Sequence, residues 1–334
     1  MKIAAADLNR MESLLQCEIS KDVQKAIQYL MQDELIGLPT ETVYGLAGNA
    51  FSTKAVQAIY DTKQRPRNNP LIVHVANVDA AKALCTQFPI LAEQLAAAFW
   101  PGPLTMILPK RAMVPDLVTA GHNTVAIRIP QHALALELIR QLPFPLAAPS
   151  ANPFKRISPT TAQHVADYFP HTLKMVLDGG PCLKGIESTI VGFDKDTVII
   201  YRPGNITEQD IERVTGSSVI FYEKKDNQLI APGMMAQHYA PRTPLIFTSD
   251  LQSTILQHPE KKIGLLSLSR QEDFDVTKKE VLSVHGALEE VTANLYAALH
   301  RLDVAGLDII IAEAFEESGL GKSLNDRLRR AASK

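Results

Sequence analysis

The chain has 334 residues, 46% of them hydrophobic and 21% charged, which is the composition of an ordinary globular protein with room for two domains. Its formal net charge of −2 excludes the strongly basic surface of a dedicated nucleic-acid binder, and three scattered cysteines without a CxxC spacing indicate neither a disulfide framework nor a zinc site. No apolar run reaches the ~18 residues that a membrane span needs, and no signal peptide is visible, so we expect a cytoplasmic protein.

The first predicted elements lead to a loop punctuated by proline and glycine. Ser20 precedes an amphipathic pattern that runs to about Asp33, which predicts a helix capped by Ser20, and a short apolar strand follows. The loop itself, residues 39–50 with the sequence PTETVYGLAGNA, places Thr40 at the end of that strand. Sites often lie on such loops. Ser52 then opens a second short helix.

Residues 63–75, KQRPRNNPLIVHV, join a basic segment to a buried strand that contains His74. Lys63, Arg65 and Arg67 alternate, and the following proline disfavours a helical Arg65, so we expect an extended segment with three cations on one face. The same segment could equally be a solvated charged loop, because exposed charges contribute only ~0–1 kcal/mol.

Arg128 lies among apolar neighbours in the strand pattern TVAIRIP, residues 124–130. A buried arginine is unfavourable unless it meets an anion or an acidic side chain. An internal ion pair and a ligand site both satisfy that requirement.

Residues 145–169 form the second informative stretch. Ser150 and Asn152 are two apart between two prolines, so their side chains are expected to point the same way from a rigid turn. Ser158 precedes Pro159 at the start of a helical pattern, which predicts an N-cap followed by an N1 proline. A helix N-terminus can also bind phosphate, although capping alone would explain Ser158.

The remaining patterns divide the chain. Alternating strands and a helix continue to residue 222, residues 223–243 show no periodicity, and the three strand and two helix patterns beyond them predict a small α/β domain with a parallel sheet. We therefore expect a catalytic domain at 1–222, a linker at 223–243 and a C-terminal domain at 244–334.

The candidate site residues are cations, hydroxyls, one amide and one imidazole from loops beside the strands of the first domain. No nucleophile stands beside a base and no carboxylates are clustered, so hydrolysis is not indicated. The set suits binding and positioning of a polyanion, as in phosphoryl or nucleotidyl transfer. Its members are Lys63, Arg65, Arg67, Arg128, Arg202, Thr40, Thr124, Ser150, Ser158, Ser188, Asn152 and His74.

Eight segments together resemble, in order and spacing, the long form of the threonylcarbamoyl-adenylate synthase family. They are PTETVYGLAGNA, KQRPRNNPLIVHV, FWPGPLT, TVAIRIP, APSANPFKRISPT, GIESTIVGF, YRPG and PGMMAQHYAP. The resemblance implies a YrdC-like α/β fold with a twisted mixed sheet and flanking helices, a linker that closes over the active site, and a small Rossmann-like C-terminal domain. It also implies a nucleotidyltransferase that converts L-threonine, bicarbonate or CO2, and ATP to threonylcarbamoyl-AMP and pyrophosphate, for the t6A modification of tRNA.

The resemblance further implies residue roles. The KxR and SxN signatures of the family resemble Lys63 with Arg65 and Ser150 with Asn152, which are the expected catalytic residues. Expected ATP ligands are Lys63, Arg67, Thr124, Ser150, Asn152, Ser158, Arg202 and, from the linker, His238 and Tyr239. Expected threonine ligands are Thr40, His74, Arg128 and Ser188. Mg2+ is expected on the ATP phosphates, without a metal site of the protein's own. Met235 and Ala236 depart from the basic and aromatic or histidine residues that relatives commonly carry there.

Two other functions stay open on the sequence. One is an RNA-binding module that recognises tRNA through the basic segment, which the sequence pI of about 6.5 argues against. The other is a carbamoyl transferase with another acceptor, whose zinc-finger and acylphosphatase-like extensions this chain lacks. For the synthase we expect transfer of the product to the tRNA threonylcarbamoyl transferase machinery, without strong direct tRNA binding.

Overall fold

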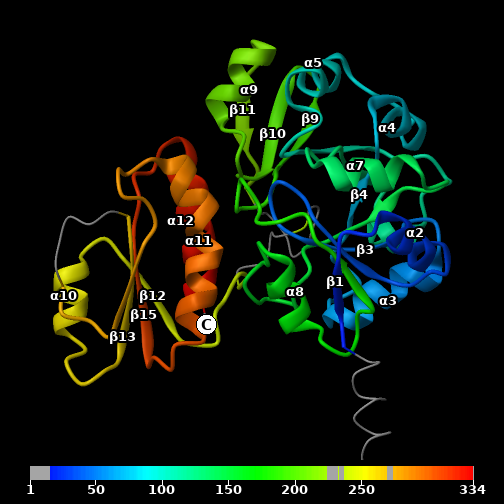
Figure 1. Cartoon of the computed structure of the whole chain (residues 1–334). Coiled ribbons are helices and arrows are strands. Elements are labelled where there is room, and N and C mark those ends of the chain that lie inside the picture. Colours follow the sequence, from blue (N-terminus) through cyan, green and yellow to red (C-terminus); the bar gives the residue numbers. More distant parts are fainter. Residues whose placement is uncertain (1–15, 224–231, 233–236, 269–273, 334) are drawn as a thin grey trace, which may run out of the picture.

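The computed structural model describes residues 16–223, 232, 237–268 and 274–333, which form a large mixed sheet with its helices and a smaller parallel sheet with its own (Figure 1). The larger sheet has eleven strands in the order β1-β8-β2-β3-β7-β4-β6-β5-β9-β10-β11. Its strands are β1 (Glu18–Ser20), β2 (Ile36–Leu38), β3 (Gly45–Asn49), β4 (Ile72–His74), β5 (Leu104–Pro109), β6 (Thr124–Arg128), β7 (Leu146–Ala147), β8 (Met175–Leu177), β9 (Thr189–Asp194), β10 (Thr197–Arg202) and β11 (Val219–Phe221).

Helices flank this sheet, and their caps test two of the sequence predictions. The Ser52 side chain accepts a hydrogen bond from Ala55 N, which confirms that Ser52 begins a helix. The prediction for Ser20 is wrong: Ser20 ends β1, which pairs with β8, and Asp22 caps the helix that follows. The helices are α2 (Val23–Met31), α3 (Thr53–Lys63), α4 (Val78–Leu84), α5 (Ile90–Phe99), α6 (Asp116–Thr119), α7 (Ala133–Arg140), α8 (Ala162–Tyr168) and α9 (Glu208–Thr215).

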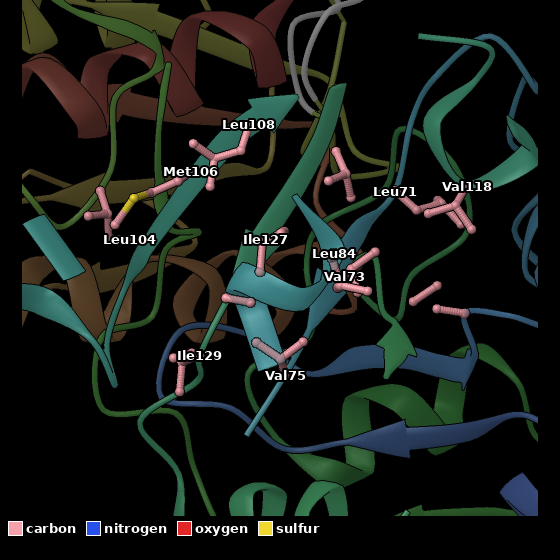
Figure 2. Close-up of a cluster of buried hydrophobic side chains, with 14 of the residues drawn as sticks. Leu71, Val73, Val75, Leu84, Leu104, Met106, Leu108, Val118, Ile127 and Ile129 are labelled. Carbon is pink, nitrogen blue, oxygen red and sulfur yellow. The ribbon is translucent and has the colours of Figure 1, made fainter. Parts of the chain in front are cut away.

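Alternating apolar side chains build the main core of the large sheet. Figure 2 shows Leu104, Met106 and Leu108 along β5 and Ile127 on β6, all of them buried in one cluster. The two strands are antiparallel, with Met106 opposite Ile127, so every second residue of each strand faces the core. Trp100, the one tryptophan in the sequence, belongs to this cluster and donates its indole N–H to Leu104 O at 2.8 Å.

The smaller domain is a four-stranded parallel sheet in the order β12-β15-β13-β14. Helices α11 and α12 lie on the side of this sheet that faces the larger domain, and α10 lies away from it (Figure 1). The parallel α/β architecture agrees with the sequence prediction, which missed only the short α10 and β14. The elements are β12 (Leu245–Thr248), α10 (Leu251–Leu256), β13 (Ile263–Ser267), β14 (Lys278–Val281), α11 (Leu288–Asp303), β15 (Ile309–Glu313) and α12 (Gly319–Ala332).

The chain crosses from one sheet to the other between Phe221 and Leu245. Of the linker predicted at 223–243, the structure describes residues 223, 232 and 237–243, so Met235 and Ala236 lie outside the described residues. No helix of the described chain is long and apolar enough to cross a membrane.

Candidate functional site

Nine of the fourteen residues predicted for the site line one cavity of about 40 Å³ at the junction of the large sheet, the linker and the loops beside them. They come from seven separate stretches of sequence, which the fold brings together. The nine are Thr40, Arg65, His74, Arg128, Ser150, Ser188, Arg202, His238 and Tyr239, and they share the cavity with Thr42, Val43, Gly45, Ile72, Ala148, Pro149, Glu187 and Pro232.

The basic segment is folded, and the expectation of three cations on one extended face is wrong. Helix α3 continues through Lys63, and Gln64 takes a left-handed conformation that ends it. Arg65 is then turned inward, because its guanidinium donates to Asn69 O at 3.1 Å and to Pro70 O at 2.8 Å. Lys63 and Arg65 are buried in consequence, whereas Arg67 is exposed and outside the cavity.

Lys63 lies behind the cavity wall and holds the turn that carries Ser150. Its Nζ donates to Ser150 O at 2.6 Å and to Asn152 O at 2.5 Å. Burial, and then the neighbouring Arg65 charge, lower the pKa of the Lys63 amine well below its usual value, while two carbonyl acceptors favour the protonated form. Lys63 therefore fixes the backbone of residues 150–152, the SAN turn, from the side away from the cavity.

Asn152 and Ser150 have different surroundings, although both belong to this turn. The Asn152 amide donates to Pro153 O at 2.8 Å and to Arg156 O at 3.0 Å, so it braces the next turn of the loop. Only Ser150 lines the cavity.

Ser158 does not cap a helix, which corrects the sequence prediction. Helix α8 begins at Ala162, and Thr161 caps it by accepting a hydrogen bond from His164 N. The Ser158 hydroxyl is fully buried and donates to Glu187 Oε1 at 2.6 Å instead. Ser158 reaches the cavity through Glu187.

Glu187 is an acidic cavity residue that the sequence interpretation missed. Besides Ser158, its carboxylate accepts from Tyr296 OH at 2.9 Å and from Arg327 Nε at 3.1 Å. Burial would raise the pKa of the Glu187 carboxyl, but Arg327, then Arg202, and the Ser158 hydrogen bond outweigh that effect and hold this pKa below its usual value. The carboxyl is therefore ionised at neutral pH.

Arg202, at the end of β10, donates hydrogen bonds to the loop that carries Ser188. Its Nη2 lies 2.9 Å from Ser188 O and 3.1 Å from Ser188 Oγ, and its Nη1 lies 3.4 Å from Pro232 O in the linker. The Ser188 hydroxyl also bonds the Thr105 hydroxyl at 2.8 Å. This arrangement joins β5, β10 and the linker beside the cavity.

Arg128 has an acidic partner, Glu41, that the sequence interpretation also missed. Arg128 Nη2 and Glu41 Oε2 are 2.8 Å apart and both side chains are buried. Burial, and then the Arg128 charge, lower the pKa of the adjacent His74 to about 3, so that imidazole is neutral at pH 7. The signal that could have identified Glu41 was its place in the same loop as Thr40, opposite a buried arginine that needed an anion.

Thr40 organises its own loop. Its hydroxyl donates to Val43 O at 2.6 Å and accepts from the backbone N–H groups of Thr42 and Val43. This turn presents the Thr40 and Thr42 side chains to the cavity. Thr124 begins β6, is half-buried and does not line the cavity.

The linker contributes His238 and Tyr239 to the wall. Their rings are 4.1 Å apart, and Tyr239 has a left-handed backbone with φ of +63°. Burial, and then the charges of Arg65, Lys63 and Arg202, lower the pKa of His238 well below its usual value. His238 is therefore neutral as well.

Several buried polar atoms at this site have no hydrogen-bond partner within the described part of the chain. They are Oε1 of Glu41, Nδ1 of His74 and of His238, Oδ1 of Asn152 and the Tyr239 hydroxyl. Buried polar atoms are seldom left unpaired in a native protein, so this concentration indicates a polar ligand. No group of three or more His, Cys, Asp or Glu side chains that could hold a metal ion occurs among the residues described.

Two family models match the chain. A model described as "Telomere recombination", for the group Sua5, YciO and YrdC, matches residues 28–204. A model described as "Threonylcarbamoyl-AMP synthase, C-terminal domain" matches residues 206–333. Together they cover both sheets apart from β1.

The relatives and solved structures agree with these models. A threonylcarbamoyl-AMP synthase of Pyrococcus abyssi is 39% identical over 93% of this chain and 94% of its own length, and one of Bacillus subtilis is 40% identical over 93% and 92%. The crystal structure of Pyrococcus abyssi Sua5 complexed with L-threonine is similar with a TM-score of 0.87 at 36% identity, covering 94% of this chain and 96% of that one. A structure of the same protein with an adjacent histidine and tyrosine replaced by alanine has a TM-score of 0.86.

Proposed function

Because this chain belongs to the threonylcarbamoyl-AMP synthase family, we propose that it converts L-threonine, bicarbonate and ATP to threonylcarbamoyl-AMP and pyrophosphate. The observation that carries this proposal is that Arg65, Arg128, Arg202, Ser150 and His74 all line one cavity. Anions repel one another in water-poor surroundings unless cations neutralise them. The cavity supplies those cations.

The chemistry requires two bonds to form in sequence. The neutral threonine amine attacks the carbon of bicarbonate and releases water, or attacks CO2 and releases a proton, and gives a carbamate in either case. A carbamate oxygen then attacks the α-phosphorus of ATP, and pyrophosphate leaves with the bonding electrons. Such transfers depend mainly on positioning and charge stabilisation, which agrees with a site that has no nucleophile of its own.

We assign the two substrates to the two sides of the cavity. ATP lies toward Ser150, Arg65 and Arg202, with Lys63, Asn152 and Ser158 supporting that side from behind. Threonine lies toward the remaining group, and its carboxylate is recognised by Arg128, which lines the cavity while its Nη2 pairs with Glu41. That group is Thr40, His74, Arg128 and Ser188. Neutral His74 can accept a hydrogen bond from the substrate amine or hydroxyl.

Substrate entry requires the cavity to widen. A volume of about 40 Å³ accommodates one or two water molecules, whereas ligand sites are typically several hundred Å³. Pro232, His238 and Tyr239 are the lining residues outside the large sheet and its loops. We assign the outward movement to Pro232, while Tyr239 stays against Tyr296 and Arg327. His238 and Tyr239 would then contact the nucleotide when the linker returns.

Mg2+ enters as part of the ATP substrate. It supplies neutralisation of the phosphate charge, and its ligands are the phosphate oxygens and water. Glu41 and Glu187, the carboxylates at the site, are engaged by Arg128 and by Arg327. The chain's own residues would therefore bind the phosphates, and the phosphates would bind the metal.

The folded basic segment removes the main support for tRNA recognition through residues 63–67, since Arg67 is the exposed cation there and Lys63 and Arg65 are buried. We propose that the product passes to the tRNA threonylcarbamoyl transferase machinery without strong binding of tRNA by this chain. A cytoplasmic location stays a prediction.

Pyrophosphate release tests the proposed function. The protein is incubated with MgATP and bicarbonate, and separately with threonine, serine or glycine. We expect release that depends on both bicarbonate and threonine, with serine and glycine slower. Release that is independent of the amino acid would contradict the assignment and favour a different acceptor.

A further inference from the structure

Glu187 connects the cavity to the C-terminal domain. Its carboxylate lines the cavity, and two of its three hydrogen-bond donors, Tyr296 on α11 and Arg327 on α12, belong to the smaller domain. Arg327 is 1% exposed, so this ion pair is dry and its geometry is fixed by both domains. We propose that Arg327 is a positioning residue for the synthase reaction. It holds Glu187 away from Arg202, whose present hydrogen-bond partners Ser188 and Pro232 are uncharged, and thereby leaves the positive charge of Arg202 available to the anionic nucleotide. This inference rests on the proposed function.

The packing around Glu187 leaves little freedom for any other arrangement. A Cβ atom on Gly185 would lie 2.2 Å from Thr292 O of α11, so the loop before Glu187 is pressed against that helix. On the other side, Ser323 Oγ of α12 donates to Gly204 O at 2.9 Å, next to the end of β10. The loop before Glu187 and the turn after Arg202 therefore both rest on the C-terminal helices.

The same two C-terminal side chains also hold the linker tyrosine. The Arg327 guanidinium lies over the Tyr239 ring at 5.3 Å, and Tyr296 stacks on that ring at 5.7 Å between centroids. Cation–π and aromatic contacts of this kind fix ring position as well as adding stability. Glu187 and Tyr239, which both line the cavity, thus have the same pair of supports.

The Arg327–Glu187 ion pair matters for nucleotide binding because of the charge of Arg202. Glu187 is near two arginines, and its carboxylate bonds directly to Arg327 and not to Arg202. If Arg327 is removed, Arg202 is the remaining cation that can neutralise a buried carboxylate there. Arg202 would then be paired internally, and the affinity for ATP would fall.

The test uses the full chain and compares KM for ATP in threonine-dependent pyrophosphate release. For Arg327→Met we expect KM to rise about tenfold or more, on the scale of one charge-assisted bond, with a smaller change in kcat. For the double variant Arg327→Met with Glu187→Gln we expect KM to return at least about threefold toward wild type, because no buried charge competes for Arg202. Arg329→Met is the matched control, since Arg329 is on the same helix and pairs with the exposed Glu317.

An unchanged KM in folded Arg327→Met, or a double variant as weak as the single one, would overturn the inference. If Arg327→Met does not fold by circular dichroism, Arg327→Lys decides: a rise of about threefold or more in KM supports the inference, and wild-type kinetics overturn it. A wild-type protein without threonine-dependent release would instead contradict the proposed function itself, so the two failures are distinguishable.

Discussion

The Nζ atom of Lys63 lies 2.6 Å from the carbonyl oxygen of Ser150, although 87 residues separate the two in sequence. This contact joins the end of α3 to the SAN turn and brings two segments, each ambiguous by itself, to one cavity. Lys63 acts on the cavity wall through the backbone, whereas Ser150 lines the cavity itself.

Replacement of Lys63 by methionine tests that contact. Lys63→Met keeps the length of the side chain but leaves the carbonyls of Ser150 and Asn152 without their donor, so we expect threonine-dependent pyrophosphate release to fall at least about tenfold. Lys54→Met is the control, because Lys54 is exposed on the same helix. Equal activity of the two variants would remove Lys63 from the site.

The buried pair of Arg128 and Glu41 predicts a stability effect. Glu41→Gln removes the charge with little change of shape and leaves the Arg128 guanidinium uncompensated, so we expect the free energy of unfolding to fall by about 3 kcal/mol in urea denaturation. The double variant Glu41→Gln with Arg128→Met should recover part of this loss. A double variant less stable than Glu41→Gln alone would show that the pair is not coupled in this way.

Gly185 predicts a cost for any side chain at the domain junction. It has φ of +70° and a Cβ there would lie 2.2 Å from Thr292 O, whereas Gly216 has φ of +64° with open space around it. Gly216→Ala should therefore lose only about 1 kcal/mol of stability from backbone strain. Gly185→Ala should lose clearly more, at least about 3 kcal/mol, because the helix must also shift. Equal losses for the two variants in chemical denaturation would contradict the close approach.

A stacked histidine pair at the junction of α8 and α11 predicts how stability depends on pH. The rings of His164 and His300 are 3.9 Å apart. Burial lowers the pKa of His164 to about 4, and burial followed by repulsion from His164 lowers that of His300 to about 3. The usual histidine value is about 6.5, so below that pH the unfolded chain binds more protons than the folded one. Stability is therefore expected to fall as pH decreases from 7 to 5.

The measurement is urea denaturation at pH 7 and at pH 5. His300→Gln should show a smaller loss of unfolding free energy between these two pH values than the wild type. His171→Gln serves as the control, because His171 is exposed. An identical pH dependence in His300→Gln and wild type would remove the stacked pair as a cause.

Local patterns predicted the elements whose formation depends on neighbours in sequence. Ser52 capped its helix, the strand that contains His74 formed, and the C-terminal strands proved parallel. Ser20 and Ser158 do not cap helices because each interacts with a residue distant in sequence. Ser20 pairs with β8, and the Ser158 hydroxyl donates to Glu187. Tertiary contacts of this kind outweigh a capping preference of about 1 kcal/mol.

The candidate site was predicted better for its cations than for its acids. Arg128 could be recognised from its apolar neighbours because a buried arginine needs an anion, and Arg202 was placed at the site by the family resemblance. Glu41 and Glu187 were missed, since an acidic residue in a loop is ordinarily solvated and only the fold shows that each faces a buried arginine. The exposure of Arg67 likewise depends on the inward turn of Arg65 onto Asn69 and Pro70.

The position of Trp100 has a consequence for fluorescence spectroscopy. Its indole is buried in the core of the large sheet and donates a hydrogen bond to β5, far along the chain from α11 and α12. Emission excited selectively in the single tryptophan therefore reports the melting of the eleven-stranded sheet alone. Tryptophan emission would not report separation or unfolding of the smaller sheet. A second chromophore placed on α12 would make the unfolding transitions of the two sheets individually measurable.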